Sequence, residues 1–323
     1  MGFDVAGHKI TLSASIGIAI EGPGGQSVEE LLHNADTAMY VAKARNRGGV
    51  QLFDETMRSD TLHRLSLEND LGEALDRGQF SVQYQPVINL ADARVAGAEA
   101  LVRWHHPRHG ILAASTFVSL AESSGLLPNL DLWVLEEACT AADGMAAGAP
   151  GGDGLAIMVN LSPSGLRSPT LVEDIGAVLR RTGVAPQRVV LEVPERAILR
   201  DTERMAERLG DLKSLGVRLT LDDFGTGYSS LSYLRRLPVD SVKIDRIFIE
   251  GLSRDPGRMG LVQAIIRLAQ SLTLDVIAEG VEQQAELDTL QAIGCRLAQG
   301  YILCEPLSLE ALAEFVSQRG IGT

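Results

Sequence analysis

Hydrophobic and polar positions follow strand and helix periods in turn along this chain, and their order predicts two parts. Residues 10–20 alternate in part and predict a strand. A capping box of Ser27 and Glu30 then opens a helix with one apolar face, and V-Q-L-F at 50–53 predicts a second strand. This segment is too small to bury a good core by itself. Residues 55–78 predict a helix that links it to the rest of the chain.

Apolar runs alternate with helix-length segments from residue 80 onward, which is the pattern of βα units. The runs 80–88 and 94–104 are joined by a short N-L-A-D-A segment, which suits an antiparallel hairpin because a parallel crossover needs about a dozen residues. We expect an α/β fold: a (β/α)8 TIM-like barrel with one antiparallel strand over residues 57–323, after a small α+β fragment over residues 1–56. An open doubly wound sheet is the alternative, but its Gly-rich first turn is missing.

The charge and composition of the chain exclude several function classes. Its 323 residues carry a formal net charge of −13, which argues against binding to DNA or RNA polymers, where basic patches supply the affinity. The sequence contains no run of about 18 apolar residues, so we expect no membrane span, and the N-terminus does not resemble a signal peptide. Cys139, Cys295 and Cys304 have no C-x-x-C spacing, so we expect them to pack in the core of a reduced, cytoplasmic protein.

Polar side chains stand where successive predicted strands end. They are Glu99, Asn160, Glu192, Asp222, Asp223, Lys243, Glu279 and Gln299. The carboxyl ends of barrel strands meet on one face, where barrel enzymes build their active sites. Scattered, solvated acids are the alternative, but hard oxygen ligands from several strands favour Mg2+ or Mn2+ and chemistry on a phosphate. Adjacent residues of a regular strand point to opposite faces, so we expect the strand to end at the Asp222–Asp223 pair.

Several motifs occur in a fixed order over residues 62–315. They are Q-P (85–86), E-A-L-V-R (99–103), H-P (106–107), V-N-L-S (159–162), L-E-V-P-E (191–195), D-D-F-G-T-G-Y-S-S-L (222–231), V-K-I-D (242–245), A-E-G-V-E (278–282) and Q-G-Y (299–301). With this set the chain resembles the EAL domain family, the cyclic di-GMP phosphodiesterases. E-A-L alone is a weak signal, whereas the D-D-F-G-T-G-Y-S-S-L block is highly specific.

The resemblance implies hydrolysis of cyclic di-GMP to linear pGpG with two Mg2+ or Mn2+ ions. The metal ligands that the resemblance implies are Glu99, Asn160, Glu192, Asp222, Asp223 and Glu279. It also implies catalytic roles for Lys243, Glu279 and Glu99. Either Glu279 or the metal ions would activate the water. Arg103 becomes a phosphate contact, with a structural ion pair as its alternative, and Gln299 and Gln85 become substrate contacts.

The same resemblance implies a homodimer. A loop that contains Gly225 and Gly227 would couple the contact between protomers to metal binding, with Glu195 as its anchor. Two rival functions remain. A non-hydrolysing cyclic di-GMP receptor is disfavoured because the chain keeps every expected metal ligand and Lys243, and a regulatory scaffold would act through protein contacts alone. Departures from the family pattern, at Ala114, Pro194, Arg196 and Cys304-Glu305, touch no expected ligand and concern regulation instead.

The N-terminal part also resembles a known family. Residues 8–54, with S-I-G-I-A and A-D-T-A-M-Y-V-A-K-A-R-N-R-G-G, are similar to the C-terminal end of a GGDEF (diguanylate cyclase) domain. The nucleotide-binding half of that domain is not among them, so we expect no synthesis of cyclic di-GMP. The G-G-D-G at 151–154 lies in a Gly/Pro-rich loop, and we interpret it as a turn rather than a cyclase signature.

Overall fold

The chain forms two compact units that divide between Glu73 and Ala74. The computed structural model describes residues 2–5, 8–11, 13–21, 25–45, 49–146, 154–198, 201–226 and 234–322. The boundary expected from the sequence falls near the start of helix α2 (Glu55–Ala74), whereas chain contacts keep nearly all of this helix with the first unit. Across the described parts of the chain, no helix is long and apolar enough to cross a membrane.

The first unit contains two small sheets. Strand β1 (Gly2–Val5) pairs antiparallel with β2 (His8–Thr11), and β3 (Ile16–Ile18) pairs parallel with β4 (Val50–Leu52). The single strand expected over residues 10–20 is therefore two strands, because the chain changes its pairing partner between β2 and β3. The strand expected at V-Q-L-F is confirmed as β4.

Helix α1 (Val28–Arg45) begins at the capping box expected from the sequence. The backbone N–H of Glu30 donates to Ser27 Oγ at 3.2 Å, and the backbone N–H of Ser27 donates to Glu30 Oε2 at 3.0 Å. These two bonds satisfy donors that a helix N-terminus otherwise leaves free. Gly17 lets β3 approach this helix closely, since a Cβ there would lie 2.0 Å from the carbonyl oxygen of Ala35.

The second unit is a closed barrel of eight strands. Around the barrel the order is β5, β6, β8, β9, β10, β11, β12 and β13, which returns to β5. Strand β5 (Phe80–Asn89) runs antiparallel to both of its neighbours, β6 (Val95–His106) and β13 (Leu297–Ala298). Every other neighbouring pair in the ring is parallel. The expected TIM-like barrel with one reversed strand is confirmed.

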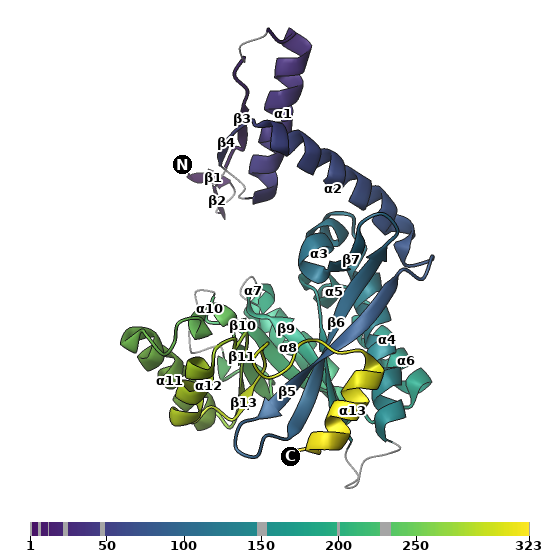
Figure 1. The fold of residues 1–323 in the computed structure, drawn as a ribbon, viewed down its shortest axis with the longest axis vertical. Helices are drawn as coiled ribbons and strands as arrows, with labels where there is room; N and C mark the ends of the chain where they lie inside the picture. The colour runs from purple at the N-terminus through teal and green to yellow at the C-terminus, as the bar shows by residue number, and fades with distance from the viewer. Residues whose placement is uncertain are drawn as a thin grey trace. The chain divides into compact units, whose positions relative to one another are not determined.

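Helices surround the barrel, and α4 and α6 lie side by side on one flank (Figure 1). The remaining strands are β7 (Gly110–Ala113), which extends β6 as a hairpin, β8 (Ala156–Asn160), β9 (Val189–Pro194), β10 (Arg218–Phe224), β11 (Ser241–Ile244) and β12 (Asp275–Ala278). The described helices of this unit are α3 (Ala114–Ser123), α4 (Leu127–Ala146), α5 (Pro163–Leu166), α6 (Leu171–Thr182), the 3-10 helix η1 (Pro186–Arg188), α7 (Glu195–Ile198), α8 (Thr202–Ser214), α10 (Arg246–Ile249), α11 (Pro256–Ser271), α12 (Gln284–Ala292) and α13 (Leu309–Arg319).

Barrel strands are buried on both faces, because one face lines the interior and the other packs against helices. Strand β9 is buried at every position. An apolar layer fills the middle of the barrel and consists of Val87, Ala156, Met158, Val190, Ile277 and Leu297. Cys139 and Cys295 are buried, as the expected packing role requires, whereas Cys304 is only half-buried, and all three cysteines are free thiols. The apolar layer leaves the carboxyl ends of the parallel strands for polar side chains.

Candidate functional site

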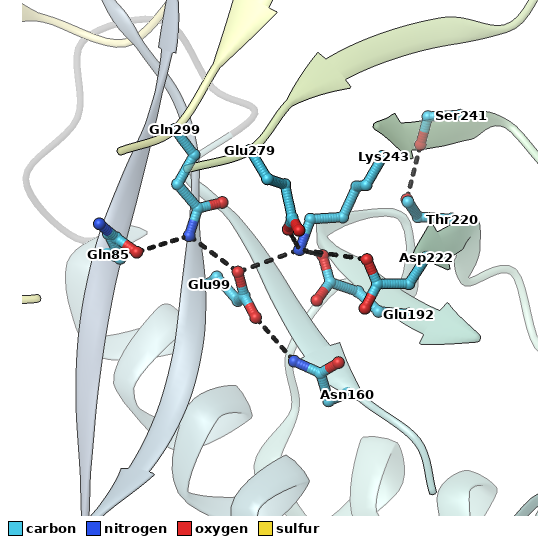
Figure 2. A network of polar contacts seen from close by, with 10 residues as sticks. All are labelled: Gln85, Glu99, Asn160, Glu192, Thr220, Asp222, Ser241, Lys243, Glu279 and Gln299. Atoms are coloured by element: carbon cyan, nitrogen blue, oxygen red, sulfur yellow. Dashed lines mark hydrogen bonds and ion pairs between the residues drawn. The ribbon is translucent and has the colours of Figure 1, made fainter. Parts of the chain in front are cut away.

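Each of the eight barrel strands supplies one polar side chain to a ring at one end of the barrel. The members of this polar ring are Gln85, Glu99, Asn160, Glu192, Asp222, Lys243, Glu279 and Gln299 (Figure 2). Glu279 and Gln299 directly follow β12 and β13, and Gln85 pairs with Glu99 across β5 and β6. The structure thus brings together eight of the residues that the sequence singled out.

Lys243 lies at the centre of the ring, and its side chain has no solvent exposure. Its Nζ is 3.0 Å from Glu99 Oε2, 2.9 Å from Glu192 Oε1 and 3.9 Å from Asp222 Oδ1, and it forms a further ion pair with Glu279. Four carboxyl groups therefore share one ammonium group. A ring with this excess of acid can accept additional positive charge.

Amide side chains fix the orientation of Glu99. Asn160 Nδ2 donates to Glu99 Oε1 at 2.7 Å, and Gln299 Nε2 donates to Glu99 Oε2 at 2.8 Å. Gln299 Nε2 also donates to Gln85 Oε1 at 2.9 Å, and Gln85 Nε2 donates to the carbonyl oxygen of Cys304 at 3.0 Å. Both oxygens of Glu99 are thus held by donors from other strands, so its carboxylate has little freedom to rotate.

Burial and charge shift the pKa values of the ring in opposite directions. Burial alone would lower the pKa of Lys243, but the surrounding carboxylates raise it well above its ordinary value, so the ammonium group stays charged. Burial raises the pKa of Glu192 well above its usual range, and the charge of Glu99 adds to this rise. Burial also raises the pKa of Glu279 to about 8, against the opposing effect of Lys243. Burial acts to raise the pKa of Glu99 as well, but Lys243 and the amide hydrogen bonds hold it below its usual value.

Three buried carboxylate oxygens of the ring accept no hydrogen bond: Glu192 Oε1, Glu192 Oε2 and Asp222 Oδ1. Two of them, Glu192 Oε1 and Asp222 Oδ1, lie 2.9 Å and 3.9 Å from Lys243 Nζ. Buried acceptors without a donor are costly unless a cation satisfies them, and hard oxygen atoms suit Mg2+ or Mn2+. Among the described residues, however, no three acidic, histidine or cysteine side chains already have the arrangement of a metal site, because the ring acids converge on Lys243 instead. The donor chemistry fits a divalent ion, which has to compete with Lys243 for the same oxygens.

Asp222 and Asp223 point in different directions. The expectation that β10 ends at this pair is wrong, because the strand runs on to Phe224. A register shift in the pairing of β10 with β11 falls here, and Asp223 adopts a left-handed backbone conformation with φ of 56°. Asp222 is buried in the ring, whereas Asp223 is half-buried, and burial together with the charges of Asp222 and Asp245 raises its pKa to about 6. A β-bulge therefore separates the two side chains.

Arg103 and Glu195 lie outside the polar ring. Arg103 Nε donates to Gln83 Oε1 at 2.7 Å, and within the described residues no carboxylate forms an ion pair with Arg103. Glu195 Oε2 accepts a hydrogen bond of 2.9 Å from the backbone N–H of Gly225, at the start of the D-D-F-G-T-G-Y loop. Gly227 and the rest of that loop through residue 233 lie outside the described residues, as do residues 151–153 of the G-G-D-G segment.

A cleft of about 260 Å3 opens beside the ring. Gln85, Glu99, Glu279 and Gln299 line it, together with three side chains that the sequence analysis did not single out: Arg246, Glu282 and Tyr301. Arg246 Nη1 lies 2.8 Å from Glu282 Oε1, and the Tyr301 side chain is exposed. Sequence reasoning could have found Tyr301 and Glu282, because they end the Q-G-Y and A-E-G-V-E motifs. Arg246 and Glu282 become neighbours only through the pairing of β11 with β12.

A second feature that the sequence analysis did not predict lies at the turn that follows Asn160. Asp131, on α4, is buried, and its Oδ2 accepts from the backbone N–H of Ser162 at 2.9 Å and from Ser162 Oγ at 2.6 Å. Ser162 Oγ in turn accepts from the backbone N–H of Gly165 and caps α5. The turn that follows Asn160 is therefore fixed to α4. Burial raises the pKa of Asp131 to about 6 although both bonds from Ser162 act to lower it.

The comparisons with known proteins agree with this geometry. The model of the family described as EAL domain matches residues 68–306, and that of Diguanylate cyclase, GGDEF domain matches residues 2–49. The chain is 40% identical over 316 residues to MucR of Pseudomonas aeruginosa, named a bifunctional diguanylate cyclase/cyclic di-GMP phosphodiesterase. It is 41% identical over 310 residues to NbdA of the same species, named a cyclic di-GMP phosphodiesterase. These matches cover 98% and 96% of the chain but only 46% and 39% of the relatives.

Solved structures give the same assignment. The phosphodiesterase of P. aeruginosa MucR in complex with c-di-GMP is 40% identical, with a TM-score of 0.73 over 76% of this chain and 99% of that one. The EAL domain of Mycobacterium smegmatis DcpA is 33% identical, with a TM-score of 0.64 over 75% of this chain and 100% of that one. Because the EAL domain model matches most of the chain and these two solved relatives are matched along nearly their whole lengths, the chain belongs to the EAL domain family.

Proposed function

We propose that this protein hydrolyses cyclic di-GMP to linear pGpG. The observation that carries the proposal is the polar ring, in which four buried carboxyl groups surround Lys243 beside a cleft. Relatives whose names include cyclic di-GMP phosphodiesterase are about 40% identical to the chain. The chain spans less than half the length of those relatives, so the activity of the whole protein belongs to this proposal as well.

The proposed cofactor is a pair of divalent metal ions, either Mg2+ or Mn2+. Glu99, Asn160, Glu192, Asp222, Asp223 and Glu279 would hold them. When bound, such ions lower the pKa of water and stabilise charge on phosphate oxygens. The buried oxygens of Glu192 and Asp222 support this role, since they accept no hydrogen bond.

The residues of the chain have distinct proposed roles in the reaction. Lys243 carries a permanent positive charge among the acids and would stabilise negative charge that develops on the phosphoryl oxygens. Glu279, with a pKa raised to about 8 and a place on the cleft, is suited to take a proton from the attacking water. Gln85 and Gln299 line the cleft and would orient the nucleotide, and Arg103 would contact a phosphate. Water would attack one phosphodiester in line, and the 3′ oxygen would leave.

One experiment tests the activity directly. The purified chain is incubated with cyclic di-GMP and Mg2+ or Mn2+, and the nucleotides are separated by chromatography. We expect pGpG to accumulate, and we expect none when a chelator is present. Unchanged cyclic di-GMP that nevertheless binds the protein would contradict hydrolysis and support the receptor function. No binding at all would support the scaffold.

The proposed homodimer and the proposed cytoplasmic location rest on separate observations. Glu195 fixes Gly225 at the start of the loop that would couple the contact between protomers to metal binding. Light scattering at micromolar concentration should report a dimer, and a fully active monomer would contradict this. Three free thiols suit a reducing compartment, and fractionation of the native host would test that location.

A further inference from the structure

A second cavity opens at the opposite end of the barrel, where the strands begin. It has a volume of about 1200 Å3. Its floor is the apolar layer beneath the polar ring, whose members Ala156, Met158, Val190, Ile277 and Leu297 are buried, and the half-buried Ala96, Leu274 and Ile321 line it as well. The interior of an eight-stranded barrel is ordinarily filled by side chains. A cavity of this size at the amino-terminal mouth therefore offers apolar surface to a ligand.

Arg218 stands at the mouth of this cavity as the first residue of β10. It is separated by two and four residues from Thr220 and Asp222, so all three share the face of β10 that looks into the barrel. Within the described residues, the side chain of Arg218 forms no hydrogen bond and no ion pair. Its guanidinium group thus presents unused donors and a positive charge at the edge of an apolar interior.

The acidic side chains at the mouth do not offset this charge, because each already has a cationic partner. Asp240 accepts from Lys213 Nζ at 2.6 Å and from the backbone N–H of Leu219 at 2.7 Å. Asp275 Oδ1 lies 3.3 Å from Arg296 Nη1. The mouth is therefore a locally cationic opening on a chain whose formal net charge is −13. An anion is favoured at this place over a neutral or cationic head group.

We propose that the amino-terminal mouth of the barrel is a second binding site, for a small amphipathic anion. The apolar body of the ligand packs against Ala96, Leu274 and Ile321 over the apolar floor of the cavity, and its anionic head binds Arg218. A medium-chain carboxylate has this chemistry. The site is independent of the proposed hydrolysis, because the apolar layer lies between it and the polar ring.

An occupant would lie against the strands that carry two members of the polar ring. Ser241 lines the cavity, and its Oγ lies 2.6 Å from Thr220 Oγ1 across β10 and β11. Two residues further along these strands stand Asp222 and Lys243 (Figure 2). A ligand in this cavity would therefore contact β10 and β11 near their amino-terminal ends, on the same strands that carry Asp222 and Lys243.

Calorimetric titration of the complete chain with sodium octanoate tests the site. We expect saturable binding, weakened about tenfold by Arg218→Gln because a charge-assisted bond is lost. Ala156→Leu fills the apolar interior and should abolish binding. Arg267→Gln, which removes one exposed charge from α11, serves as the matched control and should bind as the unmodified chain does. Acetate, which has the head without the body, should show no measurable binding.

Exposed apolar residues of the first unit, such as Ile16 and Val50, can take up octanoate without specificity. That contribution is the same in all variants and cancels in their comparison. Equal octanoate affinity in the unmodified chain and in Arg218→Gln would overturn the proposal, as would the absence of saturable binding in the unmodified chain. Arg218 is exposed, so its replacement leaves the fold intact and the test decisive even if Ala156→Leu misfolds.

Discussion

Lys243 and Glu192 form an ion pair wholly inside the barrel: Nζ lies 2.9 Å from Oε1, and neither side chain is exposed to solvent. Three further carboxyl groups share the same ammonium group. Breaking a buried pair by removing one partner leaves a charge without compensation, which costs about 3–5 kcal/mol. The stability and the chemistry of the polar ring therefore both depend on one lysine.

Replacing Lys243 by methionine should lower the stability of the barrel by about 3 kcal/mol and stop turnover. Mn2+ should increase the stability of this variant more than that of the unmodified chain, because the ion then has no ammonium group as a competitor. Thermal unfolding with and without Mn2+ measures both effects. Lys213→Met, which removes a half-exposed ion pair with Asp240, is the control and should cost about 1 kcal/mol or less. Equal responses of both variants to Mn2+ would contradict the shared site.

Glu99→Gln should reduce turnover by at least about a hundredfold. Both oxygens of Glu99 accept hydrogen bonds, so the amide nitrogen of glutamine would face a donor from Asn160, Gln299 or Lys243. Binding of cyclic di-GMP should survive, since the cleft keeps its shape. Chromatography of products and a separate nucleotide titration measure the two effects. Glu207→Gln on α8 is the control, and near-normal hydrolysis by Glu99→Gln would refute the role of Glu99.

Asp222 and Asp223 should respond differently to replacement. Asp222→Asn alters a buried member of the ring, so activity should be lost at every Mn2+ concentration. Asp223→Asn changes a half-buried side chain beyond the bulge, so excess Mn2+ should restore part of the activity. Activity as a function of Mn2+ concentration distinguishes the two variants. We propose that Asp222 would hold both ions and Asp223 only one, and identical curves would contradict this proposal.

Asp131→Asn should stabilise the protein at neutral pH. Burial raises the pKa of Asp131 from 3.8 to about 6, so between these values the folded state binds more protons than the unfolded state. The contribution of protonated Asp131 to the free energy of unfolding is therefore complete below about pH 4. It falls by about 3 kcal/mol as the pH rises to about 6. One oxygen accepts both bonds from Ser162, and the asparagine oxygen can replace it.

Urea unfolding of Asp131→Asn and the unmodified chain at several pH values checks this prediction. The stability advantage of the variant should be greatest above about pH 6 and should shrink toward pH 4. Because both proteins share every other titrating group, the difference isolates Asp131. An advantage that does not change with pH would contradict the raised pKa.

Thr273→Gly should raise the melting temperature. Thr273 has a φ of 59°, a conformation that costs a residue with a Cβ about 1–2 kcal/mol and glycine almost nothing. Part of this gain is lost to the greater freedom of glycine in the unfolded chain, which leaves about 0.5–1 kcal/mol. Thr140→Gly, inside helix α4, is the matched control and should lower stability by a similar amount. Calorimetry that finds both variants destabilised would contradict the strain at Thr273.

The sequence by itself determined the barrel, its reversed strand and the identity of the polar ring. Periodicity locates the strands, and short or helix-length connections decide their directions. Parallel strands joined by helices must place their carboxyl ends on one face, so Asn160, Glu192 and Lys243 were expected together before any contact was known. Local sequence also fixed the start of α1, because the capping box of Ser27 and Glu30 involves only neighbouring residues.

Only the tertiary structure decided what each of these groups contacts. Lys243 and Glu99 are 144 positions apart, and their distance of 3.0 Å depends on the stagger of the strands around the closed barrel. The bulge at Asp223 belongs to the pairing of two strands, and the bonds from Ser162 to Asp131 join a loop to a distant helix. Residue type and local period carry no information about such pairings, because burial and charge depend on segments that meet only when the chain folds.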